Sequence, residues 1–138
     1  LSFEIKDKNV MIVDDSIVRG NTSKEIVKMV RDFGAKKVYF VSACPPLINP
    51  CFYGVDIPTR SELIASNSSN EEIRQHIDVD ILMYQVLDDL IEAVTRKGEH
   101  EIYRPCAACL DGKYITGNVD ENRITLHEQE RLKEQNSK

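Results

Sequence analysis

The stretch from residue 10 to residue 22 constrains the fold more than any other part of the sequence. Four apolar residues, three of them β-branched, predict a buried strand that ends at two adjacent carboxylates. A short polar turn with one glycine follows, and apolar residues then recur at helical spacing up to residue 33. Thr22 and Glu25 have the spacing of a capping box. The order of strand, acidic pair, polar turn and helix predicts an α/β fold.

The polar turn of this stretch is suited to binding a phosphate group. A helix start leaves backbone N–H groups without internal partners and carries partial positive charge. Ser16, Asn21 and Thr22 add side-chain donors. Gly20 permits a close approach of the backbone, and Arg19 offers a cation.

The acidic pair, Asp14 and Asp15, restricts what such a phosphate can belong to. Bare carboxylates repel a phosphate unless they bind sugar hydroxyls or share a divalent cation with other phosphates. The simplest ligand that meets both needs is a phosphorylated sugar, with its phosphate in the turn and its hydroxyls on the acids. The alternative is that the Asp-Asp pair only solubilises a loop.

The remaining chain continues the α/β pattern. Residues 38–43 predict a second strand, which would be parallel to the first with a right-handed crossover. Prolines predict an ordered loop over residues 44–60. Further expected elements are a lead-in strand or turn at residues 3–5, helices at 59–65, 69–77 and 86–97, the last ended by Gly98, a strand at 81–84, and a frayed helix or disorder from residue 122 onward.

The composition excludes several classes of protein. A length of 138 residues suits one domain, and a net charge of −5 argues against binding nucleic acid. No apolar run approaches the ~20 residues that span a bilayer, so we expect no membrane association. The chain begins at Leu1, close to its key motif, and we expect it to be a piece of a longer polypeptide.

Four cysteines stand at positions 44, 51, 106 and 109. Because nothing in the sequence indicates secretion, free or metal-bound thiols are expected rather than disulfides. The Cys-x-x-Cys pair at 106 and 109 by itself fits a redox pair, half of a zinc site, part of an iron–sulfur site or a buried structural role.

Residues 10–22 resemble the 5-phosphoribosyl-1-pyrophosphate (PRPP) motif of type I phosphoribosyltransferases. The variant Asp-Asp-Ser-Ile-Val-Arg-Gly-x-Thr resembles the amidophosphoribosyltransferases in particular, with Asn21 where many members have Thr. Residues 58–65 also resemble that family. The resemblance implies a parallel sheet flanked by helices, with residues 1–98 as the C-terminal part of the phosphoribosyltransferase domain and 99–138 as a helical and loop segment.

The resemblance also implies a set of PRPP-binding residues and a magnesium ion held by Asp14 and Asp15. It places no catalytic residue in the chain, because this chemistry depends on positioning rather than on a protein nucleophile. The implied PRPP-binding residues are Asp14, Asp15, Ser16, Ile17, Val18, Arg19, Gly20, Asn21 and Thr22.

Two cysteine segments resemble the amidophosphoribosyltransferases that carry a [4Fe–4S] cluster. They are Pro50-Cys51-Phe52-Tyr53-Gly54 and Cys106-Ala107-Ala108-Cys109-Leu110-Asp111-Gly112-Lys113-Tyr114. The resemblance implies Cys51, Cys106 and Cys109 as cluster ligands and a fourth ligand outside this chain. Cys44, at a strand end before two prolines, is interpreted as a packing residue.

The function implied is that of a cytoplasmic enzyme of purine synthesis. It would form 5-phosphoribosylamine, pyrophosphate and glutamate from PRPP, glutamine and water. Expected partners are a glutaminase domain of the same enzyme, further copies in a homo-oligomer and purine nucleotides as feedback inhibitors, and this chain alone is expected to be inactive. The alternatives are a PRPP-sensing regulator and a purine salvage phosphoribosyltransferase, and the cysteine segments argue against both.

Overall fold

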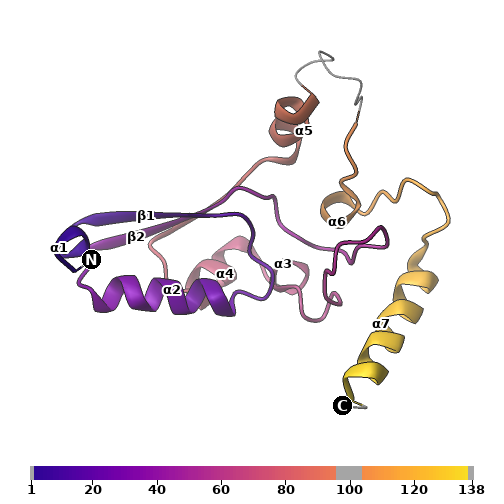
Figure 1. Cartoon of the computed structure of the whole chain (residues 1–138), viewed down its shortest axis with the longest axis horizontal. Coiled ribbons are helices and arrows are strands. Elements are labelled where there is room, and N and C mark those ends of the chain that lie inside the picture. The colour runs from indigo at the N-terminus through magenta and orange to yellow at the C-terminus, as the bar shows by residue number, and fades with distance from the viewer. Residues whose placement is uncertain (1, 96–103, 137–138) are drawn as a thin grey trace.

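The computed structural model describes residues 2–95 and 104–136 (Figure 1). Within these residues no helix is both long and apolar enough to cross a membrane. The elements are α1 (Ser2–Ile5), β1 (Asn9–Asp14), α2 (Asn21–Asp32), β2 (Lys37–Ser42), α3 (Ile64–Asn67), α4 (Asn70–His76), β3 (Ile81–Tyr84), α5 (Leu87–Thr95), α6 (Ala108–Asp111) and α7 (Glu121–Asn136).

The strands form a three-stranded parallel sheet in the order β1-β2-β3. The predicted α/β class and the parallel pairing are therefore confirmed. The register aligns Asp14 with Ser42 and Ser42 with Tyr84. The carboxyl ends of all three strands consequently lie at one edge of the sheet, where ligands of parallel α/β sheets bind.

One face of the sheet packs on α2 and α4, which Figure 1 shows on the same side of the strands. Alternation along each strand directs every second side chain to this face. The core there joins sheet, helix and turn residues, and its buried members are Ile17, Val27, Val30, Val38, Phe40, Ile77 and Val79.

The opposite face of the sheet is apolar but exposed. Met11 and Val13 of β1 are 58% and 66% exposed, and Ile81 and Met83 of β3 are 45% and 43% exposed. The register places Tyr39 and Val41 of β2 between these two pairs. In the described part of the chain, this six-residue group, called the open face below, has no helix packed over it (Figure 1).

Two expectations for the elements need correction. Residues 2–5 form a helix rather than a lead-in strand or turn, and the helix expected at 59–65 is α3, at Ile64–Asn67. Of the frayed helix or disorder expected from residue 122 onward, the structure has the helix, which is α7, 16 residues long. The helix expected over 86–97 is confirmed within the described residues as α5, Leu87–Thr95. Its end at Gly98 lies outside the described residues, as does the expected boundary between residues 98 and 99.

The C-terminal segment packs against the loop that follows β2. The Tyr114 hydroxyl donates to the Pro50 carbonyl at 2.8 Å, and the N–H groups of Ile48 and Asn49 both donate to the Cys109 carbonyl at 3.0 Å. The ring of Phe52 stacks edge-on against Tyr114, with centroids 5.3 Å apart. These contacts fix the loop that the prolines predicted as ordered.

Candidate functional site

A cavity of about 620 Å³ lies at the carboxyl end of β1, against the start of α2. The structure brings together there all the residues predicted to bind PRPP, with one exception. The side chain of Ile17 is 2% exposed and packs in the core, so this residue reaches a ligand only through its backbone. The cavity is lined by Asp14, Asp15, Ser16, Val18, Arg19, Gly20, Asn21, Thr22, Ser23, Asp56 and Pro58.

The acidic pair is oriented by two local hydrogen bonds. The N–H of Asp15 donates to Asp14 Oδ1 at 2.9 Å, and the Ser16 hydroxyl donates to Asp15 Oδ1 at 2.8 Å. Because Asp14 is the last residue of β1, the sheet fixes its backbone. Each of these bonds uses one oxygen of a carboxylate, and both groups line the cavity.

The start of α2 differs from the sequence prediction in its cap. The N-cap is Gly20, at φ +79°, and not Thr22, so the predicted capping box of Thr22 and Glu25 is wrong. The backbone angle at Gly20 favours glycine, and a Cβ there would lie 2.9 Å from Ile64 Cδ1, so the end of the Ile64 side chain would have to move to accommodate it. Asn21 and Thr22 therefore open the helix at the cavity wall, where a helix start favours anions.

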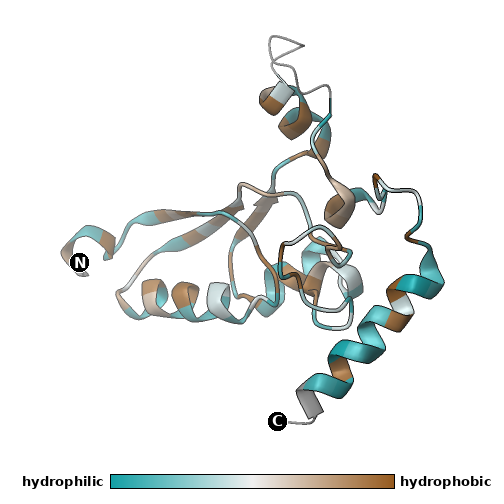
Figure 2. Ribbon diagram, turned by 45° about the vertical axis from the view of Figure 1, so that its right-hand side comes forward, coloured by the Kyte–Doolittle hydropathy of each residue, from teal (hydrophilic) through white to brown (hydrophobic). Residues whose placement is uncertain are grey.

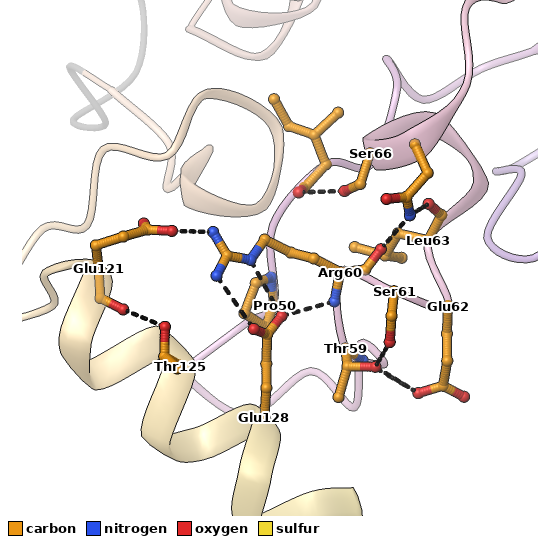
Figure 3. Close-up of polar contacts among 12 residues, drawn as sticks. Pro50, Thr59, Arg60, Ser61, Glu62, Leu63, Ser66, Glu121, Thr125 and Glu128 are labelled. Carbon is orange, nitrogen blue, oxygen red and sulfur yellow. Dashed lines mark hydrogen bonds and ion pairs between the residues drawn. The ribbon is translucent and has the colours of Figure 1, made fainter.

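Arg19 is held by an ion pair with Glu62. Its Nη2 and Nε donate to Glu62 Oε1 at 2.6 and 3.1 Å. The other carboxylate oxygen of Glu62 accepts from the Thr59 hydroxyl at 2.9 Å (Figure 3). The pairing with Arg19, opposed by burial and aided by Thr59, holds the pKa of Glu62 below its usual value. The carboxylate of Glu62 thus contacts the guanidinium of Arg19, the cation that the sequence analysis offers as a partner for a phosphate group.

Asp56 and Pro58 line the cavity but were missed by the sequence reasoning. They belong to the loop after β2, far along the chain from the acidic pair. Asp56 is joined to Arg131 of α7 by an ion pair of 2.7 Å. The one signal that points to them is position, because the loop that follows β2 begins at the edge where β1 also ends.

The carboxylates of Asp14 and Asp15 fit a magnesium ion in their chemistry. Magnesium prefers oxygen ligands and is commonly held by one or two carboxylates together with substrate phosphates. Among the described residues there is no group of three or more His, Cys, Asp or Glu side chains that could hold a metal ion. The expectation of a magnesium ion stays a prediction.

One cysteine from each of the two segments lies at a small apolar cluster, together with Cys44. Cys44, Cys51 and Cys109 are half-buried around Leu47, Ile57 and Leu63. Cys106, which opens the same Cys-x-x-Cys pair as Cys109, is exposed. Burial first, and then the nearby Cys44, Cys51 and Cys106, raise the pKa of Cys109 to about 11. Cys44 packs at this apolar cluster, as predicted, and lies at the same cluster as two of the expected ligands, Cys51 and Cys109.

The thiol groups at this apolar cluster are suitable ligands for an iron–sulfur centre, but the described residues do not form a complete set of ligands. The N–H of Tyr53 donates to Cys51 Sγ at 3.3 Å, the kind of bond that tunes a cluster sulfur. Among residues 2–95 and 104–136, however, no three ligating side chains are close enough to hold a metal ion. The expectation of a cluster therefore stays a prediction.

Comparisons with known proteins agree on one family. The chain is 48% identical to an amidophosphoribosyltransferase of Pseudomonas aeruginosa over 131 residues, which is 95% of this chain and 26% of that protein. It is 49% identical to that of Methanocaldococcus jannaschii over 112 residues, 81% of this chain and 22% of that protein. The Escherichia coli protein is 48% identical over 121 residues, covering 88% and 24%. No protein-family model matches the chain.

A solved structure extends this likeness to the fold. The PRPP amidotransferase of Bacillus subtilis, solved in complex with ADP and GMP, matches with a TM-score of 0.75 and 44% identity. The match covers 83% of this chain and 25% of that one, so the chain spans about a quarter of the length of its relatives. Over the stretch that it covers, the chain is homologous to the amidophosphoribosyltransferases, of which it matches about a quarter.

Proposed function

We propose that the chain supplies the PRPP-binding part of an amidophosphoribosyltransferase. The complete enzyme would make 5-phosphoribosylamine, pyrophosphate and glutamate from PRPP, glutamine and water, the first committed step of purine synthesis. One observation carries the proposal: the acidic pair at the end of β1 and the helix start at Gly20 line a single cavity. That pairing of chemistries suits a sugar phosphate, and the relatives of the chain bear the matching name.

In this reaction, the role of this part of the enzyme would be mainly to bind and orient PRPP. Glutamine hydrolysis elsewhere would release ammonia, whose nitrogen lone pair forms a bond to C1 of the ribose. The bond from C1 to pyrophosphate breaks, pyrophosphate leaves with the electron pair, and the new ammonium group loses a proton. The turn at residues 16–22 would hold the 5′-phosphate. Asp14 and Asp15 would hold the ribose hydroxyls and oppose positive charge that grows on the sugar.

Two inorganic groups belong to the proposal. A magnesium ion held by Asp14 and Asp15 would neutralise charge on the pyrophosphate. A [4Fe–4S] cluster on Cys51, Cys106 and Cys109, with a fourth ligand outside this chain, would join the C-terminal segment to the loop around Cys51. Its contribution would be to folding, as metal–ligand bonds supply folding energy in small regions.

The proposed partners follow from the same family. The chain would work with a glutaminase domain of its own enzyme, in a homo-oligomer in the cytoplasm. Purine nucleotides would inhibit it, and the B. subtilis relative was solved with ADP and GMP bound. Domain limits of 1–98 and 99–138 remain part of the proposal.

The first test is a calorimetric titration of the chain with PRPP in the presence of Mg²⁺. Asp15→Asn should weaken binding about tenfold or more, a loss of ~1.4 kcal/mol, since a carboxylate contact to hydroxyls or Mg²⁺ is removed. The matched control is Asp88→Asn, which changes another adjacent aspartate pair, in the first turn of α5 and outside the cavity. Equal affinities for the two variants, or no binding by the unaltered chain, would contradict the proposal.

Activity separates the proposal from its two rivals. The complete polypeptide should form phosphoribosylamine from PRPP and glutamine, whereas the 138-residue chain should not. A PRPP-sensing regulator would bind PRPP without turnover in either form. A salvage enzyme would consume PRPP with a free purine base and ignore glutamine.

The iron–sulfur prediction needs its own experiment. Protein prepared without oxygen, or reconstituted with iron and sulfide, should be brown and hold iron and sulfide in a fixed ratio. Replacing Cys109 by Ser should remove most of the colour. Replacing Cys44 by Ser should leave it, because Cys44 is assigned to packing. Colourless protein, or equal losses in the two variants, would argue against the assigned ligands.

A further inference from the structure

Glu62 lies outside the predicted motif yet binds the cation of that motif with two hydrogen bonds. The Nη2 and Nε groups of Arg19 donate to one carboxylate oxygen of Glu62, at 2.6 and 3.1 Å. The two residues are 43 positions apart in the sequence, so the contact depends on the tertiary fold. Glu62 belongs to residues 58–65, a stretch that resembles the family and to which the sequence analysis assigns no chemical role.

The carboxylate of Glu62 is itself fixed from behind. Its second oxygen accepts from both the hydroxyl and the N–H of Thr59, at 2.9 and 3.3 Å. Thr59 is 1% exposed, and its hydroxyl also bonds to Ser61 at 2.9 Å (Figure 3). Because both carboxylate oxygens of Glu62 accept hydrogen bonds, its side chain has little freedom to move. It therefore holds the Arg19 side chain in one position.

Arg19 stands between two cavities. It lines the PRPP cavity and also a neighbouring cavity of about 430 Å³, which Glu62 and Ile64 line as well. The N–H of Ile64 donates to the carbonyl of Val18 at 3.0 Å, and Ile64 Cδ1 packs where a Cβ of Gly20 would fall. Residues 59–64 thus support the turn on both sides of Arg19.

We propose that Glu62 is a positioning residue, which fixes the Arg19 guanidinium at the rim of the cavity before PRPP binds. This inference rests on the proposed function, since it needs an anionic substrate in that cavity. Arg is a long side chain, and holding it in place removes the entropic cost of ordering it on binding. The pair leaves 51% of the Arg19 side chain accessible, so a phosphate can still approach it.

A competing role for the same contact predicts the opposite sign. If Glu62 mainly neutralised Arg19 or withheld it from the substrate, removing the negative charge would strengthen anion binding. If Glu62 positions Arg19, the same change weakens binding. The direction of the effect therefore decides between the two roles.

The test measures steady-state kinetics of the complete polypeptide with PRPP. Glu62→Gln should raise KM for PRPP about three- to tenfold, as expected for one long side chain left unordered, with kcat unchanged. Arg19→Lys, which keeps the charge but lacks the planar two-donor fork, should raise KM to a similar degree. In an Arg19→Ala background, Glu62→Gln should add nothing further. If Glu62→Gln instead loosened the structure in general, it would lower kcat as well, and its effect would remain in the Arg19→Ala background.

Glu71→Gln is the matched control. It breaks another two-bond Arg–Glu pair, from Arg74 to Glu71 at 2.6 and 2.8 Å, which lies within α4 and outside the PRPP cavity. Its KM should equal that of the unaltered protein. A lower or unchanged KM in Glu62→Gln would overturn the positioning role while PRPP binding stands. Failure of the unaltered protein to bind PRPP would instead overturn the proposed function.

Discussion

At the scale of single residues, the site depends on positions that tolerate few alternatives. Gly20 combines a left-handed backbone with a neighbour 2.9 Å from where its Cβ would lie. Asp14 and Asp15 are fixed by bonds from the backbone and from Ser16. The sequence motif predicted most of this wall, because its residues are contiguous and their order carries the geometry. It did not predict Asp56 or Glu62, because their distance from the motif in the chain leaves no local pattern.

Gly20→Ala should destabilise the protein by about 1–2 kcal/mol for the left-handed backbone alone, with a further loss from the contact with Ile64. The matched control is Gly117→Ala, at φ +69°, where an added Cβ meets nothing within 4 Å. Thermal unfolding of both variants separates the two causes. If both variants lose the same stability, the contact of the added Cβ with Ile64 contributes nothing to the destabilisation.

Asn21→Thr should keep PRPP affinity within about threefold, because either side chain can donate one hydrogen bond at the first turn of α2. Asn21→Ala should lose about 0.5–1.5 kcal/mol of binding, the usual value for one hydrogen bond. Calorimetry on the two variants provides the comparison. Unchanged affinity in Asn21→Ala would mean that the Asn21 side chain does not contact the ligand.

At the scale of elements, helix α7 shows where reasoning from the sequence reached its limit. Figure 2 shows it as largely hydrophilic, with isolated hydrophobic residues. It is nevertheless docked along one stripe at helical spacing, by Glu121 and Glu128 to Arg60, by Ile124 in a small core, and by Arg131 to Asp56. Because the stripe is mostly polar, a search for apolar periodicity could not detect it.

The other elements were predictable in proportion to their local signals. Strand β3 lies at Ile81–Tyr84 as expected, and α4 begins after Ser69 with a full capping box to Glu72. Both have compact patterns of apolar or capping residues. The helix expected at 59–65 failed because Thr59 and Glu62 bond to each other in a turn, and the helix begins only at Ile64. Side-chain bonds of this kind compete with helix formation.

The docking of α7 should weaken in acid. Partial burial of Glu128 by itself raises its pKa, but hydrogen bonds from Arg60 outweigh this and hold the pKa below the usual value of a glutamate. A group with a depressed pKa stabilises the fold above its unfolded value and loses that contribution as the pH falls through its folded value. The stability gap between unaltered protein and Glu128→Gln, about 1–3 kcal/mol near neutrality, should therefore shrink below pH 4.5.

Denaturant unfolding of the unaltered protein and of Glu128→Gln across this pH range gives the comparison. Glu130→Gln, an exposed position on the same helix, provides the control and should track the unaltered protein at every pH. A gap that stays constant as the pH falls would show that the charge of Glu128 does not hold α7.

At the scale of the whole molecule, the sheet is covered on one face and apolar on both. The open face presents Met11, Val13, Ile81 and Met83 in two rows across the strands. Contiguous exposed apolar patches favour association and bind hydrophobic dyes. The isolated chain should therefore show such binding while still folded.

Val13→Thr combined with Met83→Thr should lower dye fluorescence and raise solubility, with stability changed by about 0.5 kcal/mol or less, as is usual for surface sites. Threonine keeps the preference for strands. Val10→Thr, on the face that packs against the helices, should instead destabilise the protein measurably. If the double variant unfolds as readily as Val10→Thr, the open face is not free in solution.

The short stretch around residues 59–64 has two neighbours at once. Glu62 and Ile64 contact the turn beside α2, whereas Arg60 contacts the last helix through its side chain and its backbone N–H. Helix α7 is thus linked, through residues 59–64, to the wall of the cavity. Removal of α7 should therefore disturb the turn around Arg19, although no residue of α7 lines the cavity.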